Sequence, residues 1–106
     1  KAQLPANIMI DCSHANSWKN HDFQPLVLKD VAHQIREGNT SIIGVMIESF
    51  IEAGNQAIPE DRSQMLYGCS VTDACINWPT TERILTEMRE LLKTPLLHRH
   101  ESRSKA

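Results

Sequence analysis

Short apolar runs mark three predicted strands along this chain. Residues 7–12 are mostly apolar, with Ile8, Met9 and Ile10 in succession, and residues 42–47 are entirely so, a pattern typical of strands that are buried on both faces of a parallel sheet. Residues 71–76 form a third, weaker run. Each run ends next to polar side chains, so the same kind of junction occurs three times along the chain.

Two longer segments have the period of an amphipathic helix. The first begins with Pro25, which suits a first helical turn, and ends at Gly38-Asn39, a typical helix stop. The second begins at Pro79 and is expected to end at Thr94-Pro95, because proline cannot continue the hydrogen bonds of a helix. Residues 94–106 are then expected to form a flexible tail.

The order of these elements is strand, helix, strand, long loop, strand and helix. A strand–helix–strand unit implies a right-handed crossover between parallel strands, so the predicted class is α/β. The loop from Ser49 to Cys69 has no sustained period, and loops of this length in compact domains are usually functional. Three parallel strands with helices on one side leave sheet edges uncovered, so we expect the chain to be part of a larger structure.

Composition excludes several classes of protein. The chain has 106 residues and a formal net charge of −2, so it indicates neither a nucleic-acid partner nor an anionic membrane partner. No apolar run approaches the roughly 18 residues of a membrane span, and no signal-peptide hydrophobic region follows Lys1-Ala2-Gln3, so we expect a cytoplasmic protein. An odd number of cysteines without Cys-x-x-Cys spacing argues against a disulfide framework; they are Cys12, Cys69 and Cys75.

Three chemically competent side chains stand at the ends of the three predicted strands: His14, Glu48 and Asp73. In α/β proteins, ligands and catalytic groups gather at the carboxyl ends of parallel strands. An imidazole with two carboxylates suits a divalent cation such as Mn2+, Fe2+, Co2+ or Zn2+, with positions left open for water or substrate. The pattern therefore indicates a metal site, and a polar rim that closes the sheet is the alternative.

Two neighbours of His14 bear on this site. Asp11 lies three residues before His14 and can either serve the site, by orienting the imidazole or pairing with a substrate-binding lysine, or cap the turn after the strand, and the sequence favours neither. Cys12 would share the face of His14 if the strand continued that far, so a thiolate ligand is sterically conceivable. A buried free thiol is the favoured interpretation of Cys12.

Four ordered motifs give the chain a resemblance to a known family. They are Met-Ile-Asp-Cys-Ser-His-Ala-Asn-Ser at residues 9–17, Ile-Ile-Gly-Val-Met-Ile-Glu-Ser at 42–49, Glu-Ala-Gly-Asn-Gln at 52–56 and Tyr-Gly-Cys-Ser-Val-Thr-Asp-Ala-Cys-Ile at 67–76. Together they closely resemble the C-terminal part of type I 3-deoxy-D-arabino-heptulosonate 7-phosphate (DAHP) synthases. The resemblance covers residues 4 to about 93, or roughly the last third of the family's sequence.

The resemblance implies a (β/α)8 barrel, or TIM barrel, of which residues 1–93 hold the last three strand–helix units. It implies a transferase that condenses phosphoenolpyruvate with erythrose 4-phosphate, giving DAHP and phosphate, at the first step of the shikimate pathway of aromatic amino acid biosynthesis. In the family, the residues that match His14, Glu48 and Asp73 bind the divalent metal. The histidine also lies close to phosphoenolpyruvate, which makes His14 the candidate catalytic residue.

The resemblance also implies what this chain lacks. The family's fourth metal ligand is a cysteine near the first barrel strand, and Cys12 does not match it. The Arg and Lys residues that bind the substrates' phosphates come mostly from earlier strands. The chain alone is therefore expected to be inactive, and its expected partners are the rest of the barrel or another copy of the chain in a homo-oligomer.

Two alternatives remain open. The first is the related synthase that makes 3-deoxy-octulosonate 8-phosphate from arabinose 5-phosphate, although the Ser-His-Ala-Asn-Ser and Gly-Asn-Gln motifs count against it. The second is a non-catalytic module that self-associates through its open sheet edges.

Overall fold

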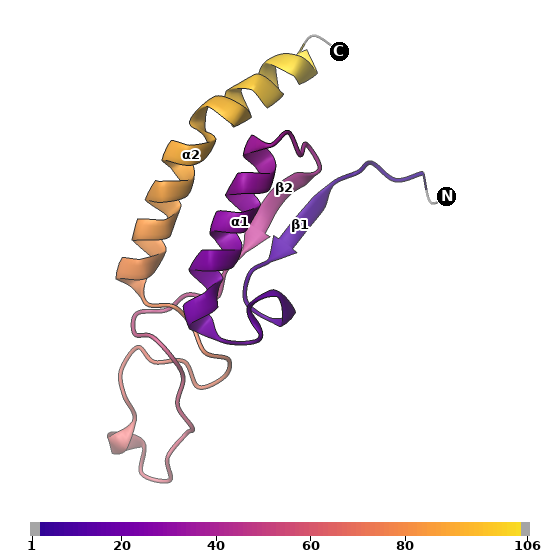
Figure 1. The fold of residues 1–106 in the computed structure, drawn as a ribbon. Helices are drawn as coiled ribbons and strands as arrows, with labels where there is room; N and C mark the ends of the chain where they lie inside the picture. Colours follow the sequence, from indigo (N-terminus) through magenta and orange to yellow (C-terminus); the bar gives the residue numbers. More distant parts are fainter. Residues whose placement is uncertain (1–2, 105–106) are drawn as a thin grey trace.

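Two parallel strands form the sheet in the computed structural model, which describes residues 3–104 (Figure 1). They are β1 (Ile8–Asp11) and β2 (Ile42–Met46), and Ile10 of β1 pairs with Val45 of β2. The helix α1 (Gln24–Arg36) connects them, with Pro25 in its first turn. The predicted strand–helix–strand unit and the α/β class are therefore confirmed.

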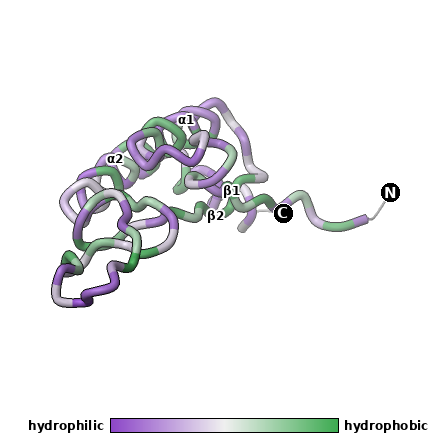
Figure 2. The backbone as a smooth tube through the Cα atoms, turned by 90° about the horizontal axis from the view of Figure 1, so that it is seen from below, coloured by the Kyte–Doolittle hydropathy of each residue, from purple (hydrophilic) through white to green (hydrophobic). Residues whose placement is uncertain are grey.

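Both long helices cover the same face of the sheet. Figure 2 shows α1 and the second helix, α2 (Trp78–Ser104), as one layer above the layer of β1 and β2. One buried apolar cluster contains Val31, Ala32, Ile35, Ile42 and Leu92. A second contains Cys12, Leu28, Ile76 and Ile84. The core thus lies between the helix layer and the sheet, and its second cluster reaches the carboxyl ends of the strands.

The other face of the sheet is open, so the prediction that both strands are buried on both faces is wrong. Met9 and Ile43 are 65% and 54% exposed. Met9 lies over Gly44, where a Cβ atom would come within 3.2 Å of Met9 Cε. The apolar composition of these runs suits strands that are covered on both faces. The helices of residues 3–104 cover only one face of the sheet.

The predicted third strand at residues 71–76 does not form. This segment instead joins the long loop through isolated bridges, in which Ser49 pairs with Ile76 and Gly54 with Cys75. Gly54 and Cys75 exchange two backbone hydrogen bonds, of 2.8 and 3.1 Å. Because these backbone groups are satisfied by residues 48–56 rather than by β2, the segment makes no ladder with the sheet.

The long loop extends away from the helices and the sheet (Figure 1). A short 3-10 turn at Arg62–Gln64 lies within it. Gln56 connects the two ends of this loop, because its side-chain amide donates to the carbonyls of Leu66 (2.8 Å) and Cys69 (3.0 Å). The radius of gyration is 17.2 Å, whereas a compact domain of this length has about 13 Å.

The helix α2 continues past Pro95 to Ser104, so the predicted helix end at Thr94-Pro95 is wrong. Figure 1 shows α2 changing direction in its C-terminal half, as expected where a proline removes a backbone donor. Arg99 anchors this half, because its guanidinium donates to the carbonyls of Ile42 (2.8 Å) and Asn39 (2.7 Å). Residues 105 and 106 of the predicted flexible tail lie outside the described residues, and the domain boundary at residue 93 stays a prediction.

We expect Arg99→Ala to loosen the C-terminal half of α2. Hydrogen bonds from a charged donor contribute about 1.5–3 kcal/mol each, so amide exchange at residues 96–103 should become at least about tenfold faster. Exchange at residues 80–92 should not change. Arg103→Ala is the matched control, because Arg103 makes a single 3.2 Å bond to the Thr40 carbonyl. Equal exchange in the two variants would show that Arg99 is not the anchor.

Neither helix of the described chain has an apolar stretch long enough to cross a membrane.

Candidate metal centre

Three side chains from three separate segments converge at the carboxyl end of the sheet. His14 lies in the turn after β1, Glu48 lies two residues after β2, and Asp73 belongs to the segment that bridges to the long loop. His14 Nε2 lies 3.0 Å from Glu48 Oε1 and 3.1 Å from Asp73 Oδ2. One ligand atom from each residue lies within 4.8 Å of the other two. The structure therefore brings together the three residues that the sequence pattern singled out.

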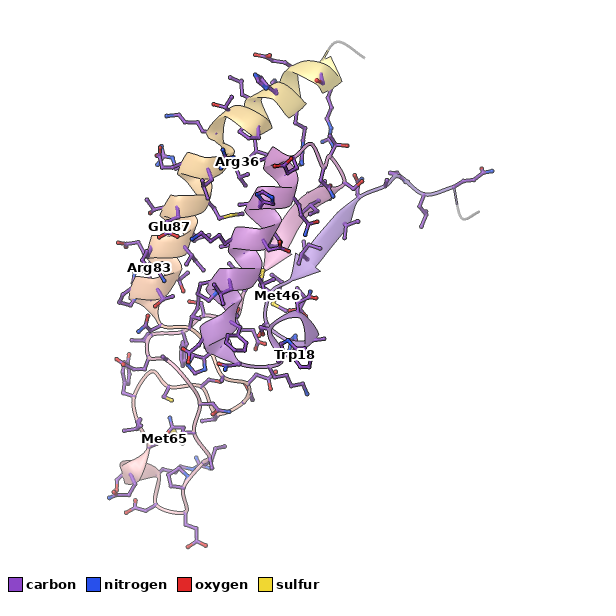
Figure 3. The ribbon with its side chains drawn as sticks, viewed as in Figure 1. Trp18, Arg36, Met46, Met65, Arg83 and Glu87 are labelled. Atoms are coloured by element: carbon purple, nitrogen blue, oxygen red, sulfur yellow. The ribbon has the colours of Figure 1, made fainter. Side chains whose placement is uncertain are left out.

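The surroundings of the cluster can be followed in Figure 3, where the labelled Met46 and Trp18 lie at this end of the sheet. Met46 is the last residue of β2, and Trp18 closes the short turn that begins after His14. The backbone N–H of Cys12, one residue past β1, donates to the Met46 carbonyl at 2.9 Å. The site thus begins where the ladder ends.

Asp11, the last residue of β1, fixes both the turn and the imidazole. Its Oδ1 accepts hydrogen bonds from the backbone N–H groups of Ser13 (2.8 Å) and His14 (3.2 Å). Its Oδ2 lies 2.7 Å from His14 Nδ1. Because a carboxylate accepts, this contact favours a proton on Nδ1, so Nε2 either carries a second proton that it donates to the carboxylates or binds a cation through its lone pair. Asp11 thus both caps the turn and orients the imidazole.

The charges of the cluster favour a bound cation. Hydrogen bonding to Asp11, and then to Asp73, raises the pKa of His14 above its ordinary value. The same contact with His14 lowers the pKa of Asp11. Three carboxylates around one imidazole carry excess negative charge, which a proton or a metal ion can neutralise.

Glu48 is the least exposed of the three, with a side-chain exposure of 22% against 41% for His14 and 62% for Asp73. Two residues to which the sequence assigned no role contact it. Ser13 Oγ donates to Glu48 Oε1 at 2.5 Å, and the Gln24 side chain bonds to the Glu48 backbone. Gln24 stands beside Pro25 at a helix start, where a polar residue usually faces solvent, so no local signal marks it.

Cys12 has no part in this cluster. Its side chain is fully buried and packs in the apolar cluster with Leu28, Ile76 and Ile84. Burial, followed by the nearby Asp11 charge, raises the pKa of the Cys12 thiol to about 11. A thiol must lose its proton to bind a metal, so the buried free thiol is confirmed as the better interpretation.

The donor set fits a divalent cation. One imidazole nitrogen and two carboxylate groups are ligands that Mn2+, Fe2+, Co2+ and Zn2+ accept. Two ligand atoms at right angles, each about 2.1 Å from an ion, lie about 3.0 Å apart. The separations of 3.0 and 3.1 Å between His14 Nε2 and the two carboxylate oxygens match this spacing. The partly exposed cluster also leaves room for further ligands.

Fold and cluster together define an α/β protein with parallel strands and a candidate metal centre at the strand ends. The sequence comparison is more specific: the chain belongs to the DAHP synthetase I family, whose sequence profile matches residues 1–86. All three candidate ligands lie inside this match.

Two relatives and one solved structure show how far the similarity extends. The chain is 54% identical over 93 residues to a Tyr-sensitive phospho-2-dehydro-3-deoxyheptonate aldolase of Enterobacter agglomerans, covering 88% of this chain and 44% of the relative. It is 50% identical over 99 residues to the Tyr-sensitive enzyme of Escherichia coli (strain K12), covering 93% and 28%. A phospho-2-dehydro-3-deoxyheptonate aldolase structure from Francisella tularensis SCHU S4 matches with a TM-score of 0.77 at 43% identity, covering 84% and 25%. The chain thus spans less than half the length of each.

Proposed function

We propose that this chain is the part of a DAHP synthase that supplies three ligands to its divalent metal. The observation that carries the proposal is the convergence of His14, Glu48 and Asp73 in a member of this family. In this proposal β1, β2 and the 71–76 segment belong to the last three strand–helix units of a (β/α)8 barrel. The names of the relatives support the activity.

The proposed reaction joins the methylene carbon of phosphoenolpyruvate to the aldehyde carbon of erythrose 4-phosphate. Water adds to the second carbon of phosphoenolpyruvate, the bond from that carbon to the phosphate oxygen breaks, and inorganic phosphate leaves. One proton of the water ends on the oxygen of the former aldehyde, which becomes a hydroxyl group, and the other ends on the phosphate. The water oxygen stays on the second carbon as a ketone. No electron donor or acceptor is needed.

The bound divalent cation, one of Mn2+, Fe2+, Co2+ or Zn2+, would supply the Lewis acidity that polarises the aldehyde carbonyl. His14, the candidate catalytic residue, would hold the cation and so orient the reacting groups. Asp11 holds its Nδ1, and a nitrogen lone pair that binds a cation cannot also accept a proton. We therefore assign to His14 the orientation of the reacting groups rather than a proton relay.

The remaining parts of the site are assigned to the rest of the full-length protein. These are the fourth ligand and the groups that bind the substrates' phosphates. The chain alone is expected to be inactive, because the reactants would be neither held nor oriented. A cytoplasmic homo-oligomer, in which the rest of the barrel or another copy covers the open sheet, is part of the same proposal.

Phosphate release by the full-length protein tests this function. We expect release with phosphoenolpyruvate and erythrose 4-phosphate, loss of release on treatment with EDTA, and recovery on addition of Mn2+. Equal or faster release with arabinose 5-phosphate would favour the eight-carbon synthase. No release with either sugar, together with no Mn2+ binding, would favour the non-catalytic module.

A further inference from the structure

Glu48 is held at both polar groups of its backbone by a side chain outside the metal set. Gln24 is fully buried, and its Nε2 donates to the Glu48 carbonyl at 3.1 Å. Its Oε1 accepts from the Glu48 N–H at 2.9 Å. The Glu48 carbonyl also accepts from the N–H of Ile76 at 3.0 Å. The peptide groups on either side of Glu48 therefore have a fixed position.

The carboxylate of Glu48 is held by a second side chain. Ser13 is 5% exposed, and its hydroxyl donates to Glu48 Oε1 at 2.5 Å. The backbone N–H of Ser13 is itself bonded to Asp11 Oδ1 at 2.8 Å, so the donor does not move freely. Glu48 has three rotatable side-chain bonds, and an ordered donor at its end restricts them.

The position of Glu48 in the chain explains why such contacts are needed. Glu48 lies two residues beyond β2, where the sheet no longer supplies hydrogen-bond partners. An unpaired buried peptide group costs about 1–3 kcal/mol. A glutamine side chain offers the same donor and acceptor as a peptide group. Gln24 therefore supplies Glu48 with the backbone hydrogen bonds that a neighbouring strand supplies to a residue inside a sheet.

We propose that Gln24 and Ser13 are positioning residues for Glu48 and so determine the metal affinity of the centre. Gln24 sets the backbone from which Glu48 projects, and Ser13 sets the orientation of its carboxylate. This inference rests on the proposed function, since it takes Glu48 as a metal ligand. Groups that orient a metal ligand typically contribute a factor of about 10–100 to metal affinity.

The test is a Mn2+ titration of the full-length protein and its variants. Gln24→Met and Ser13→Ala should each bind Mn2+ about 10–100-fold more weakly. Gln34→Met is the matched control, because Gln34 lies on the same helix, is exposed, and its side-chain amide donates to the carboxylate of Asp30 (3.0 Å), far from the metal set. Its Mn2+ affinity should not change. Without metal, amide exchange at Glu48 should be faster in Gln24→Met but not in Ser13→Ala.

Several outcomes separate this inference from its alternatives. Folded variants of Gln24 and Ser13 with normal Mn2+ affinity would overturn it, even if they were less stable. If Gln24→Met does not fold, Gln24→Glu decides, because it keeps the size and the acceptor but loses the donor to the Glu48 carbonyl. Unchanged Mn2+ affinity in His14→Ala would instead refute the metal centre itself, whatever the Gln24 variants show.

Discussion

Full-length protein that carries alanine in place of His14, Glu48 or Asp73 is expected to bind Mn2+ more than about 100-fold more weakly. Residues that only orient a ligand contribute a factor of about 10–100 to metal affinity, so loss of a ligand atom should reduce the affinity by more than that factor. Removal of Glu48 or Asp73 also takes away one of the two negative charges in the cluster that attract the cation. Isothermal titration with Mn2+ measures the effect directly.

Two variants calibrate this result. Asp11→Asn should fall between the wild type and the ligand variants, at about 10–100-fold weaker binding, because Asp11 contacts Nδ1 of the imidazole and not the ligand nitrogen Nε2. His33→Ala should have no effect. His33 and Glu37 also form a histidine–carboxylate pair, but they lie 3.8 Å apart and are 67% and 70% exposed on α1. Wild-type affinity in all three ligand variants would rule out the centre.

Leu28→Ala is expected to destabilise the protein by about 2–5 kcal/mol, the usual cost of removing a large buried side chain. Leu28 is 1% exposed and packs with Cys12, Ile76 and Ile84, so it joins α1 to β1 and to the start of α2. A shift in the urea midpoint with an unchanged slope would measure this cost.

Leu26→Ala is the control for this substitution. Leu26 lies two residues earlier on the same helix and is 62% exposed. It should change stability by less than about 0.5 kcal/mol. Similar losses in the two variants would mean that the second apolar cluster does not stabilise the fold as described.

The elements that the sequence predicted well are those fixed by local patterns. The apolar face of α1 is set by Val31, Ala32 and Ile35 at helical spacing, and all three are buried. The first two strands were predicted from the apolar residues Ile8–Ile10 and Ile42–Ile47. The candidate site followed from a general rule, that the ends of parallel strands meet, and it needed no knowledge of the loops.

The features that the sequence did not predict depend on contacts between distant residues. Pro95 looked like a helix end, but Arg99 reaches carbonyls 57 and 60 residues earlier in the chain and holds the helix beyond it. The 71–76 run had the composition of a strand, yet residues 48–56 satisfy its backbone. Gln24 became visible only when its contact with Glu48, 24 residues later, was known.

The open face of the sheet has a practical consequence. Met9 and Ile43 present apolar surface to water on that face, and such surface on short strands attracts other strands or any apolar partner. In the proposed full-length synthase, neighbouring elements would occupy that surface. A preparation of the 106-residue polypeptide by itself would meet detergents, fusion tags or other copies there instead. The solubility of the isolated chain should therefore be measured before its metal binding or activity.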